Sequence, residues 1–462
     1  MTADQLKALD PALSQFLAQF RPHCEYAPTF GHLNTYVRGL LSDLPRKTAE
    51  PVAIAAGTPV RTLQEFLKDH IWDQDQVRVS YHQHVTQHLT EVCGDDLGVV
   101  GLLDETSFLK KGKTTPGVKR QYLGCVGKVA NGIVTVHLGV CKGRYKTLVD
   151  WDLFLPEDWS EDRKRCKQAG IPDEVVHRPK WKIALEQLDR TKTNGLKLDW
   201  LTFDSGYGAS ALFMTGLDER KQSFVGEVPR ILSCRSLHQS GQSPAKEMKG
   251  QPAEEVVRNA SQFRSQQWRV LHLKRETVED QVWRVKAGRV WLSSCEGWSA
   301  GTYWLVWASS DQTGEEKFFV SNAAAEVSVE VLMRVAFRRA NVEHAFRVCK
   351  SELGLGHFEG RFYKSLMRHM CLCVTAMGFV AEHTERLRGE KPRGDDGASE
   401  SGVEVPHPRL DVSRARNQRS GKPVGDPRVS PEQKSRCTGV QTEKTHRSAG
   451  QQKTSTTQTQ TP

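Results

Sequence analysis

Two short apolar runs constrain the fold of this chain most, because each of them ends on an aspartate. Residues 97–104 read LGVVGLLD and residues 198–204 read LDWLTFD, and both runs are typical of buried strands. The segments KWKIALEQLDR and ASALFMTGLDER flank the second run and repeat apolar residues at helical spacing, and SFVGEV adds another strand. Strands that alternate with helices in this way predict an α/β fold with a mixed sheet and flanking helices.

A hairpin is predicted shortly after the first run. The β-rich segments RQYLGCVGKV and GIVTVHLGVC follow one another, and Asn131-Gly132 lies at their junction. Asn-Gly is a strong signal for the two-residue turn that joins antiparallel strands. We therefore expect the chain to reverse direction at this dipeptide.

Composition divides the chain into four regions. Residues 1–95 repeat apolar positions at three- and four-residue spacing, which predicts a helical N-terminal domain. Residues 96–229 and 321–385 hold the α/β pattern, and residues 230–320 form a β-rich block with six of the eleven tryptophans. Residues 386–462 contain no aromatic residue, isoleucine or methionine, so this basic tail is predicted to be disordered.

The net charge of the chain is +10 and its pI is about 9.0, which favours a polyanionic partner such as nucleic acid. The tail contributes +6 of this charge, so charge alone does not identify a binding surface on the folded part. No segment reaches the ~18 consecutive apolar residues of a membrane helix, and the N-terminus resembles an amphipathic helix rather than a signal peptide. Eleven scattered cysteines indicate a reducing compartment, so we expect no membrane partner and a cytoplasmic location.

A nucleotide site is one interpretation of the sequence GKT at residues 112–114, which resembles the end of a phosphate-binding loop. That motif requires a glycine five residues before its second glycine, and this position is Ser107. Pro-Gly at residues 116–117 also breaks the helix that should follow. The segment is therefore interpreted as a solvated basic loop.

Asp104 and Asp204 are the candidate catalytic residues of the sheet. Carboxylates at the ends of neighbouring strands project into one crevice, where open α/β layers place their sites. Two ionised acids in one crevice repel each other unless a cation binds between them, and carboxylate oxygens are suitable ligands for Mg²⁺ or Mn²⁺. The alternative is that each aspartate caps a turn or a helix. Glu105 is a weaker candidate because it is expected to point to the opposite face of the sheet.

A third acid lies in the helical segment FRRANVEHAFRVCK. Arg339, Glu343, Arg347 and Lys350 fall at offsets that place them within roughly 80° of one another on a helix of about 100° per residue. An acid flanked by three cations can hold a metal ion while the cations bind phosphate. The alternative is an exposed helix with ordinary i,i+4 ion pairs.

The segments LLDETSFLKKG, TFDSGYG and RANVEHAFRVCKSELGLGHFEGRFYKSLMRHM together resemble the DDE transposases of the IS4-related group, most of all the IS701 type. The resemblance covers roughly residues 20–385. It implies an RNase H-like catalytic layer, which a β-rich insertion interrupts before the helix with the last acid. The assigned domains are a DNA-binding helical domain at 1–95, a catalytic domain at 96–229 and 321–385, and an insertion at 230–320.

The resemblance also assigns the acids and a metal. The family pattern Arg-x3-Glu-x6-Lys is matched by Arg339, Glu343 and Lys350. This match implies that Asp104, Asp204 and Glu343 are catalytic and together hold Mg²⁺ or Mn²⁺, as two ions. It also implies a two-metal phosphoryl transfer in which no covalent enzyme intermediate forms.

The same resemblance places DNA near Arg339 and Lys350. Arg347 shares their helix face, and the lysines that follow Asp104 are expected to touch the same DNA strand; they are Lys110, Lys111 and Lys113. One departure is Ala336, because the family has an aromatic residue there that holds a distorted base near the cut. Another side chain must take that role, or the protein does without it.

The implied function is that of a DNA transposase, which cuts element ends and joins the 3′-OH to target DNA. Its partners would be double-stranded terminal inverted repeats and target DNA, bound by a homodimer in the prokaryotic cytoplasm near the nucleoid. Two other functions remain open. One is a catalytically inactive, transposase-derived DNA-binding protein, and the other is an RNase H-like nuclease that cuts DNA without strand transfer.

Overall fold

The computed structural model describes residues 3–237, 242–273, 281–294 and 297–389. The tail predicted at 386–462 lies outside the described residues from position 390 onward. Within the described part of the chain, no helix is long and apolar enough to cross a membrane.

Helices predominate over residues 3–91, as the apolar periodicity predicts. The fifth helix begins after Asp73, whose carboxylate accepts hydrogen bonds from the backbone N–H groups of Asp75 and Gln76 and so caps the helix. The elements are α1 (Ala3–Ala18), a 3-10 turn (Arg21–His23), α2 (Ala27–Leu40), α3 (Ala49–Ala55), α4 (Val60–Lys68) and α5 (Gln74–Glu91).

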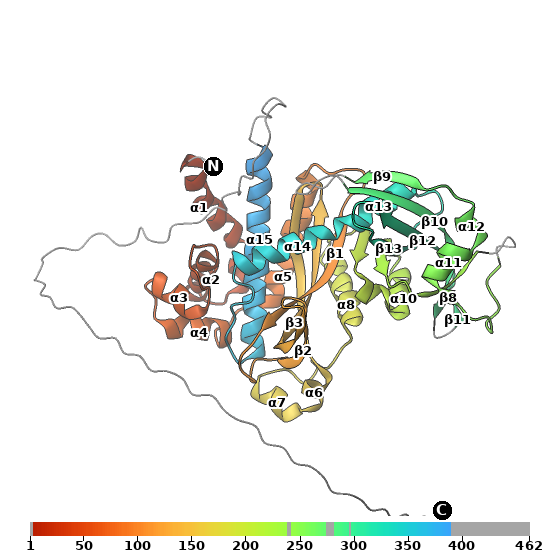
Figure 1. Cartoon of the computed structure of the whole chain (residues 1–462). Coiled ribbons are helices and arrows are strands. Elements are labelled where there is room, and N and C mark those ends of the chain that lie inside the picture. The colour runs from red at the N-terminus through yellow and green to blue at the C-terminus, as the bar shows by residue number, and fades with distance from the viewer. Residues whose placement is uncertain (1–2, 238–241, 274–280, 295–296, 390–462) are drawn as a thin grey trace, which may run out of the picture. The chain divides into compact units, whose positions relative to one another are not determined.

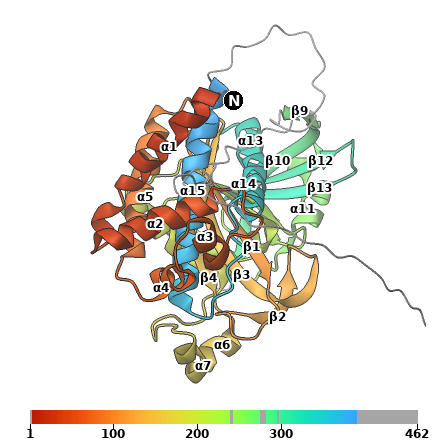
Figure 2. The same cartoon turned by 90° about the vertical axis from the view of Figure 1, so that its left-hand side faces the viewer.

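A long C-terminal helix, α15 (Tyr363–Gly389), joins these helices to the sheet. It packs against α2, α4 and α5 and also against strand β4 (Tyr145–Phe154), as Figure 2 shows. Its fully buried Arg368 donates hydrogen bonds to backbone carbonyls of Phe66 and Trp72. The N-terminal helices therefore share one hydrophobic core with the rest of the described chain.

A mixed sheet runs through the described part of the chain, and this part of the predicted fold class is confirmed (Figure 1). Strands β1, β3 and β4 are neighbours in antiparallel pairs, and β5 and β6 follow β1 on its other side in parallel. Besides β4, these strands and the edge strand β2 are β1 (Val100–Leu109), β2 (Lys119–Leu123), β3 (Lys128–Lys142), β5 (Trp200–Phe203) and β6 (Phe224–Val228).

Helices cover both faces of this sheet. On one face lie α13 (Val329–Arg338) and α14 (Ala340–Ser351), where Thr202 donates a hydrogen bond to the carbonyl of Ala336. The opposite face holds α8 (Lys180–Thr193) and α10 (Ala211–Glu219), whose Phe213 packs on Phe203. The remaining short helices of this region are α6 (Glu157–Glu161), α7 (Arg163–Gln168) and α9 (Ser205–Gly208).

The prediction of a hairpin at Asn131-Gly132 is wrong, because β3 passes through this dipeptide without turning. The chain reverses earlier, at residues 124–127 between β2 and β3, where Gly127 has a positive φ of 62°. The Asn131 amide instead donates hydrogen bonds to the carbonyls of Lys110 and Gly112. Gly132 faces Leu109 on β1, so close that a Cβ would collide with the neighbouring Phe108 carbonyl. The glycine therefore serves strand packing and not a turn.

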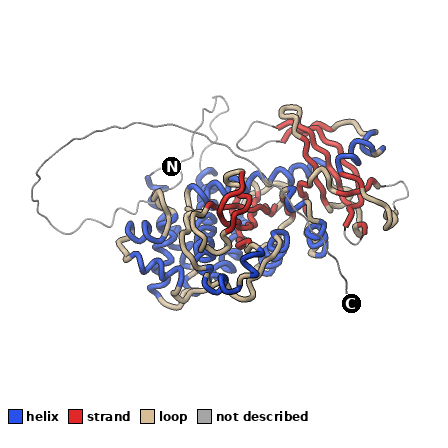
Figure 3. Tube along the Cα trace, turned by 60° about the horizontal axis from the view of Figure 1, so that its bottom comes forward, coloured by secondary structure: helices blue, strands red, loops and turns tan. Residues whose placement is uncertain are grey.

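The β-rich block at 230–320 continues the same sheet. Strand β13 pairs antiparallel with β6, from Phe318 opposite Val228 to Ser321 opposite Val225, and β12 and β10 follow. Figure 3 shows these strands in red beyond the helical part. The elements are β7 (Ser233–Ser236), β8 (Gln251–Pro252), α11 (Ala253–Asn259), α12 (Ser261–Arg264), β9 (Arg269–Leu273), β10 (Gln281–Ser294), β11 (Gly297–Trp298), β12 (Tyr303–Ser310) and β13 (Glu316–Ser321).

Candidate active site

Asp104 and Asp204 lie side by side because of the register between β1 and β5. The parallel pairing joins residues one hundred positions apart and ends at Leu102 opposite Thr202. Both aspartates follow two residues beyond that last pair, at the point where the two strands separate. The register thus brings the two aspartates to neighbouring strands at this point.

The two aspartates occupy this point in different ways. Asp204 follows the end of β5 and caps α9, because its carboxylate accepts hydrogen bonds from the N–H groups of Gly206 and Tyr207 at 3.0 and 3.3 Å. Asp104 does not end its strand, contrary to the sequence prediction. Strand β1 leaves β5 but stays paired with β3 as far as Leu109, so Asp104 lies in the middle of β1.

Glu343 reaches the same place from helix α14. An open cleft of about 550 Å³ is lined by all three acids, Asp104, Asp204 and Glu343. The acids differ in exposure, since the side chain of Glu343 is 65% exposed and that of Asp104 is 14% exposed. Three segments far apart in the sequence thus bring their carboxylates to one cleft.

Arg339 connects two of these acids. One guanidinium nitrogen lies 3.0 Å from Asp104 Oδ2 and another lies 3.4 Å from Glu343 Oε1. Arg339 stands at the junction where α13 ends and α14 begins, so the predicted single helix is interrupted at this residue. The i,i+4 ion pair of the alternative interpretation therefore exists, and the same arginine also reaches the central acid.

Burial controls the charge of Asp104. Removal of the carboxyl from water raises its pKa to about 7, the guanidinium of Arg339 opposes this rise, and the nearby Asp204 adds to it. Burial also lowers the pKa of Lys350, whose ammonium lies 5.6 Å from the centre of the Phe108 ring. A buried carboxyl next to a second acid is the situation that a bound cation would relieve.

The six predicted DNA-contact residues are distributed over three places. Arg347 and Lys350 line the cleft, and Arg339 pairs with the acids. Lys111 and Lys113 are exposed on the loop after β1. Lys110 donates hydrogen bonds to the carbonyls of Gly356 and Phe358, and burial lowers its pKa to about 8. Its ammonium thus holds the loop after α14.

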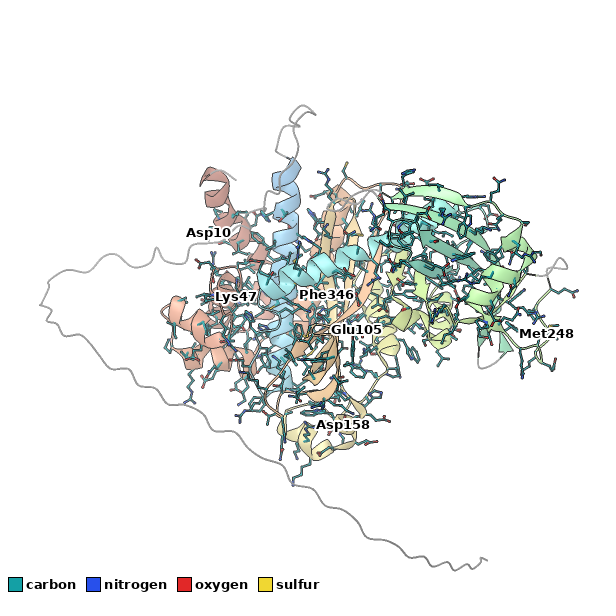
Figure 4. The ribbon with its side chains drawn as sticks, viewed as in Figure 1. Asp10, Lys47, Glu105, Asp158, Met248 and Phe346 are labelled. Carbon is teal, nitrogen blue, oxygen red and sulfur yellow. The ribbon has the colours of Figure 1, made fainter. Side chains whose placement is uncertain are left out.

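Glu105 lies next to Asp104 and forms an ion pair with Lys180 at the start of α8. This contact agrees with the expected orientation toward the opposite face, yet Glu105 also lines the cleft where β1 and β5 separate. Figure 4 labels Glu105 on β1 and Phe346 on α14, which border the cleft from two elements. Sequence patterns gave no signal for Lys180, because only the tertiary fold brings α8 to this strand.

Two aromatic residues near the acids were also missed. Tyr207 is buried, and burial followed by the charges of Glu105 and Asp104 raises its pKa above the ordinary range. Tyr122 is 65% exposed and lines the cleft from β2. The TFDSGYG segment contained a signal for Tyr207, since residues directly after a strand-end acid stay close to it. No comparable signal existed for Tyr122.

The residues present fit a hard divalent cation by their chemistry, because all three acids offer carboxylate oxygens. Asp104 and Asp204 would form the core of such a site, and Glu343 would complete it. Among the described residues, however, no three His, Cys, Asp or Glu side chains converge closely enough to hold a metal ion. The acids share a cleft while Arg339 engages two of them.

Comparison with known proteins gives one match to a family model, described as DDE superfamily endonuclease, over residues 19–289. This range contains Asp104 and Asp204 and ends before Glu343. The family resemblance noted from the sequence motifs is confirmed by this match.

One curated relative is the "Probable transposase for insertion sequence element IS701" of Microchaete diplosiphon, which is 33% identical over 203 residues. The match covers 43% of this chain and 47% of the relative, so it spans about half of the relative's length. A solved structure, the piggyBac transposase synaptic complex with hairpin DNA, aligns at 10% identity and a TM-score of 0.39, over 79% of this chain and 70% of the other.

Proposed function

Because this chain belongs to the DDE superfamily of endonucleases, we propose that it is a DNA transposase that cuts element ends and joins the freed 3′-OH to target DNA. The observation that carries the proposal is the cleft where Asp104, Asp204 and Glu343 meet the cations of α14. The similarity to a probable transposase of an insertion sequence element supports DNA as the substrate. The recognised ends in this proposal are terminal inverted repeats.

The order of the central strands supports an RNase H-like catalytic layer. Three antiparallel strands, β4, β3 and β1, are followed by the parallel strands β5 and β6. In this proposal residues 96–229 and 321–385 form that layer, and residues 230–320 are an insertion that lengthens its sheet. Residues 1–95 recognise the element ends, and two copies of the chain assemble on a pair of ends in the prokaryotic cytoplasm.

The chemistry proposed for the cleft is an in-line displacement at phosphorus. Asp104, Asp204 and Glu343 would hold Mg²⁺ or Mn²⁺, as two ions, which supply charge stabilisation for the attacking and leaving oxygens. Arg347 and Lys350 would bind the phosphates on either side of the scissile bond. Water would first attack the phosphorus at the element end, where the P–O3′ bond breaks and a 3′-OH is released. That 3′-OH would then attack a phosphorus of the target backbone, whose own 3′ oxygen leaves as the new bond forms. The chain supplies positioning and charge, so no side chain has to become a nucleophile.

The decisive experiment replaces Asp204 by asparagine. The amide oxygen of Asn still accepts the capping hydrogen bonds of α9, so the fold should be retained while one anionic ligand is lost. With DNA that carries the inverted repeats flanking this coding sequence, we expect Asp204→Asn to lose Mg²⁺-dependent cleavage. Asp173→Asn, a change at a fully exposed acid outside the cleft, should retain it. Full cleavage by Asp204→Asn would remove this cleft from the mechanism.

The same assay separates the two alternatives. Pre-cut ends with a free 3′-OH are incubated with a target plasmid, and joined products are measured. Cleavage without joining would favour the nuclease that lacks strand transfer. DNA binding with neither cleavage nor joining would favour the inactive DNA-binding protein.

A further inference from the structure

Arg339 lies between two of the three acids proposed to hold a divalent cation. Its guanidinium contacts Asp104 Oδ2 at 3.0 Å and Glu343 Oε1 at 3.4 Å, so two of the three acids already share a positive partner. Arginine keeps its charge at any physiological pH and offers five donors. A carboxylate that is paired with a guanidinium has fewer free lone pairs for a metal ion. The positive charge of the guanidinium also repels the ion.

The two contacts of Arg339 tie Asp104 and Glu343 to one side chain. Movement of Arg339 away from the cleft would free Asp104 and Glu343 together, because one guanidinium holds both. A single side chain thus controls two of the three acids.

Arg339 is also placed where it can leave the acids. It lies at the junction of α13 and α14, and its partner Glu343 is 65% exposed, so this ion pair is weak. Two further cations of α14, Arg347 and Lys350, line the same cleft. A DNA phosphodiester bound along these cations would offer Arg339 two non-bridging oxygens for a bidentate contact.

We propose that Arg339 is an internal counter-ion that suppresses divalent-metal binding until a DNA phosphate withdraws it from Asp104 and Glu343. Metal binding and DNA binding are then positively coupled, and each raises the affinity of the other by the same factor. The inference rests on the proposed function, since it requires that these acids hold the metal. It assigns to Arg339 a regulatory role in addition to a contact with DNA.

The first test measures Mn²⁺ binding to the full-length, DNA-free protein by electron paramagnetic resonance of free Mn²⁺. Arg339→Gln removes the competing charge, so its Mn²⁺ dissociation constant should fall by about ten-fold relative to wild type. Arg339→Lys keeps a cation of shorter reach and should give an intermediate value. Arg334→Gln is the matched control, because it removes the same charge five residues earlier in the chain, from an arginine that pairs with Asp95 and Asp96. Its dissociation constant should equal that of wild type.

The second test repeats the titration with DNA that carries the element ends. Wild type should bind Mn²⁺ about ten-fold more tightly with DNA than without it, whereas Arg339→Gln should show little further gain. Equal affinities of wild type and Arg339→Gln without DNA would overturn the inference, and so would an equal gain from DNA in both proteins.

Asp104→Asn distinguishes a failure of this inference from a failure of the proposed function. If Asp104→Asn abolishes Mn²⁺ binding while Arg339→Gln behaves as wild type, the metal site stands and the counter-ion role falls. If Asp104→Asn binds Mn²⁺ as wild type does in the presence of DNA, the acids do not hold the metal, and both proposals fall.

Discussion

Acidification should destabilise this protein through its buried histidines, and His369 allows the effect to be calculated. His369 lies on α15, where one ring nitrogen is 2.9 Å from the Tyr36 hydroxyl and the other is 3.1 Å from the Gly354 carbonyl. It therefore links α15 to α2 and to the loop that follows α14. Burial is the main cause that lowers its pKa to about 4.

The direction in which stability changes with pH depends on whether the folded or the unfolded state binds the proton more readily. The unfolded chain protonates His369 near its ordinary pKa of about 6.5, whereas the folded protein resists protonation until pH falls to about 4. Stability is therefore complete above pH 6.5 and is lost as pH falls from there toward 4. Between pH 7 and pH 5 the loss amounts to about 2 kcal/mol of unfolding free energy for this one residue.

The assay is urea unfolding, followed by tryptophan fluorescence at pH 7, 6 and 5 and constant ionic strength. His369→Gln is the informative variant, because the glutamine amide can still accept from Tyr36 and donate to Gly354 but does not titrate. Wild type should lose about 2 kcal/mol more than the variant between pH 7 and pH 5. Other buried groups add to the remaining pH dependence, among them His82 and His137, whose pKa values burial also lowers, and Asp104, whose pKa burial raises. Equal losses in the two proteins would refute the reasoning.

Two further predictions concern a buried ion pair and the proposed DNA face. Asp150→Asn should lower the free energy of unfolding, measured by urea unfolding, by about 3 kcal/mol. The reason is that it breaks a buried bidentate pair with Arg190, at 2.7 and 2.8 Å. A change below about 1 kcal/mol would contradict this prediction. Arg347→Gln should reduce the slope of log K against log salt by about one unit in a fluorescence-anisotropy titration of DNA. The control is Arg163→Gln, which removes a cation that pairs with Asp173 outside the cleft and should leave the salt slope unchanged. Equal salt slopes for wild type, Arg347→Gln and Arg163→Gln would exclude Arg347 from the phosphate contacts.

The acids could be found from the sequence because each depends on local order. Asp204 follows an apolar run and precedes a turn, and Glu343 belongs to a helical spacing that survives the interruption at Arg339. The interruption itself was not predictable, since neither Gly nor Pro marks it. The strand end at Asp104 was predicted wrongly because the run loses its uniform apolar character there. In the structure this change marks separation from β5, while pairing with β3 continues.

Contacts between distant segments were beyond the sequence patterns. Lys180 is the first residue of an ordinary amphipathic helix, and only the packing of α8 on the sheet brings it to Glu105. The block at 230–320 was correctly predicted to be rich in strands. Its attachment through β13 and β6 depends on a pairing between residues about ninety positions apart. Local periodicity carries no information about such a partner.

Substitution of glycines in the β2–β3 hairpin can test whether Asn131-Gly132 forms a turn or lies within a continuous strand. If the dipeptide formed a turn, the two-residue turn typical of Asn-Gly would place Gly132 at positive φ, and alanine would cost only its backbone strain of about 1–2 kcal/mol. In the structure Gly132 is not at positive φ, and a Cβ would collide with the Phe108 carbonyl and the Leu123 side chain, so β3 would have to move away from β1.

Gly132→Ala should therefore destabilise the protein more than Gly127→Ala, where φ is 62° and a Cβ would meet nothing within 4 Å. Gly124→Ala, in the same turn with open space around it and no positive φ, should be nearly neutral and is the control. Urea unfolding of the three variants gives the order of their losses. A loss at Gly132 equal to or smaller than that at Gly127 would show that the strand does not need a glycine for this approach. Because β1 carries Asp104, we also expect Gly132→Ala to reduce Mg²⁺-dependent cleavage more than Gly127→Ala at equal fractions of folded protein.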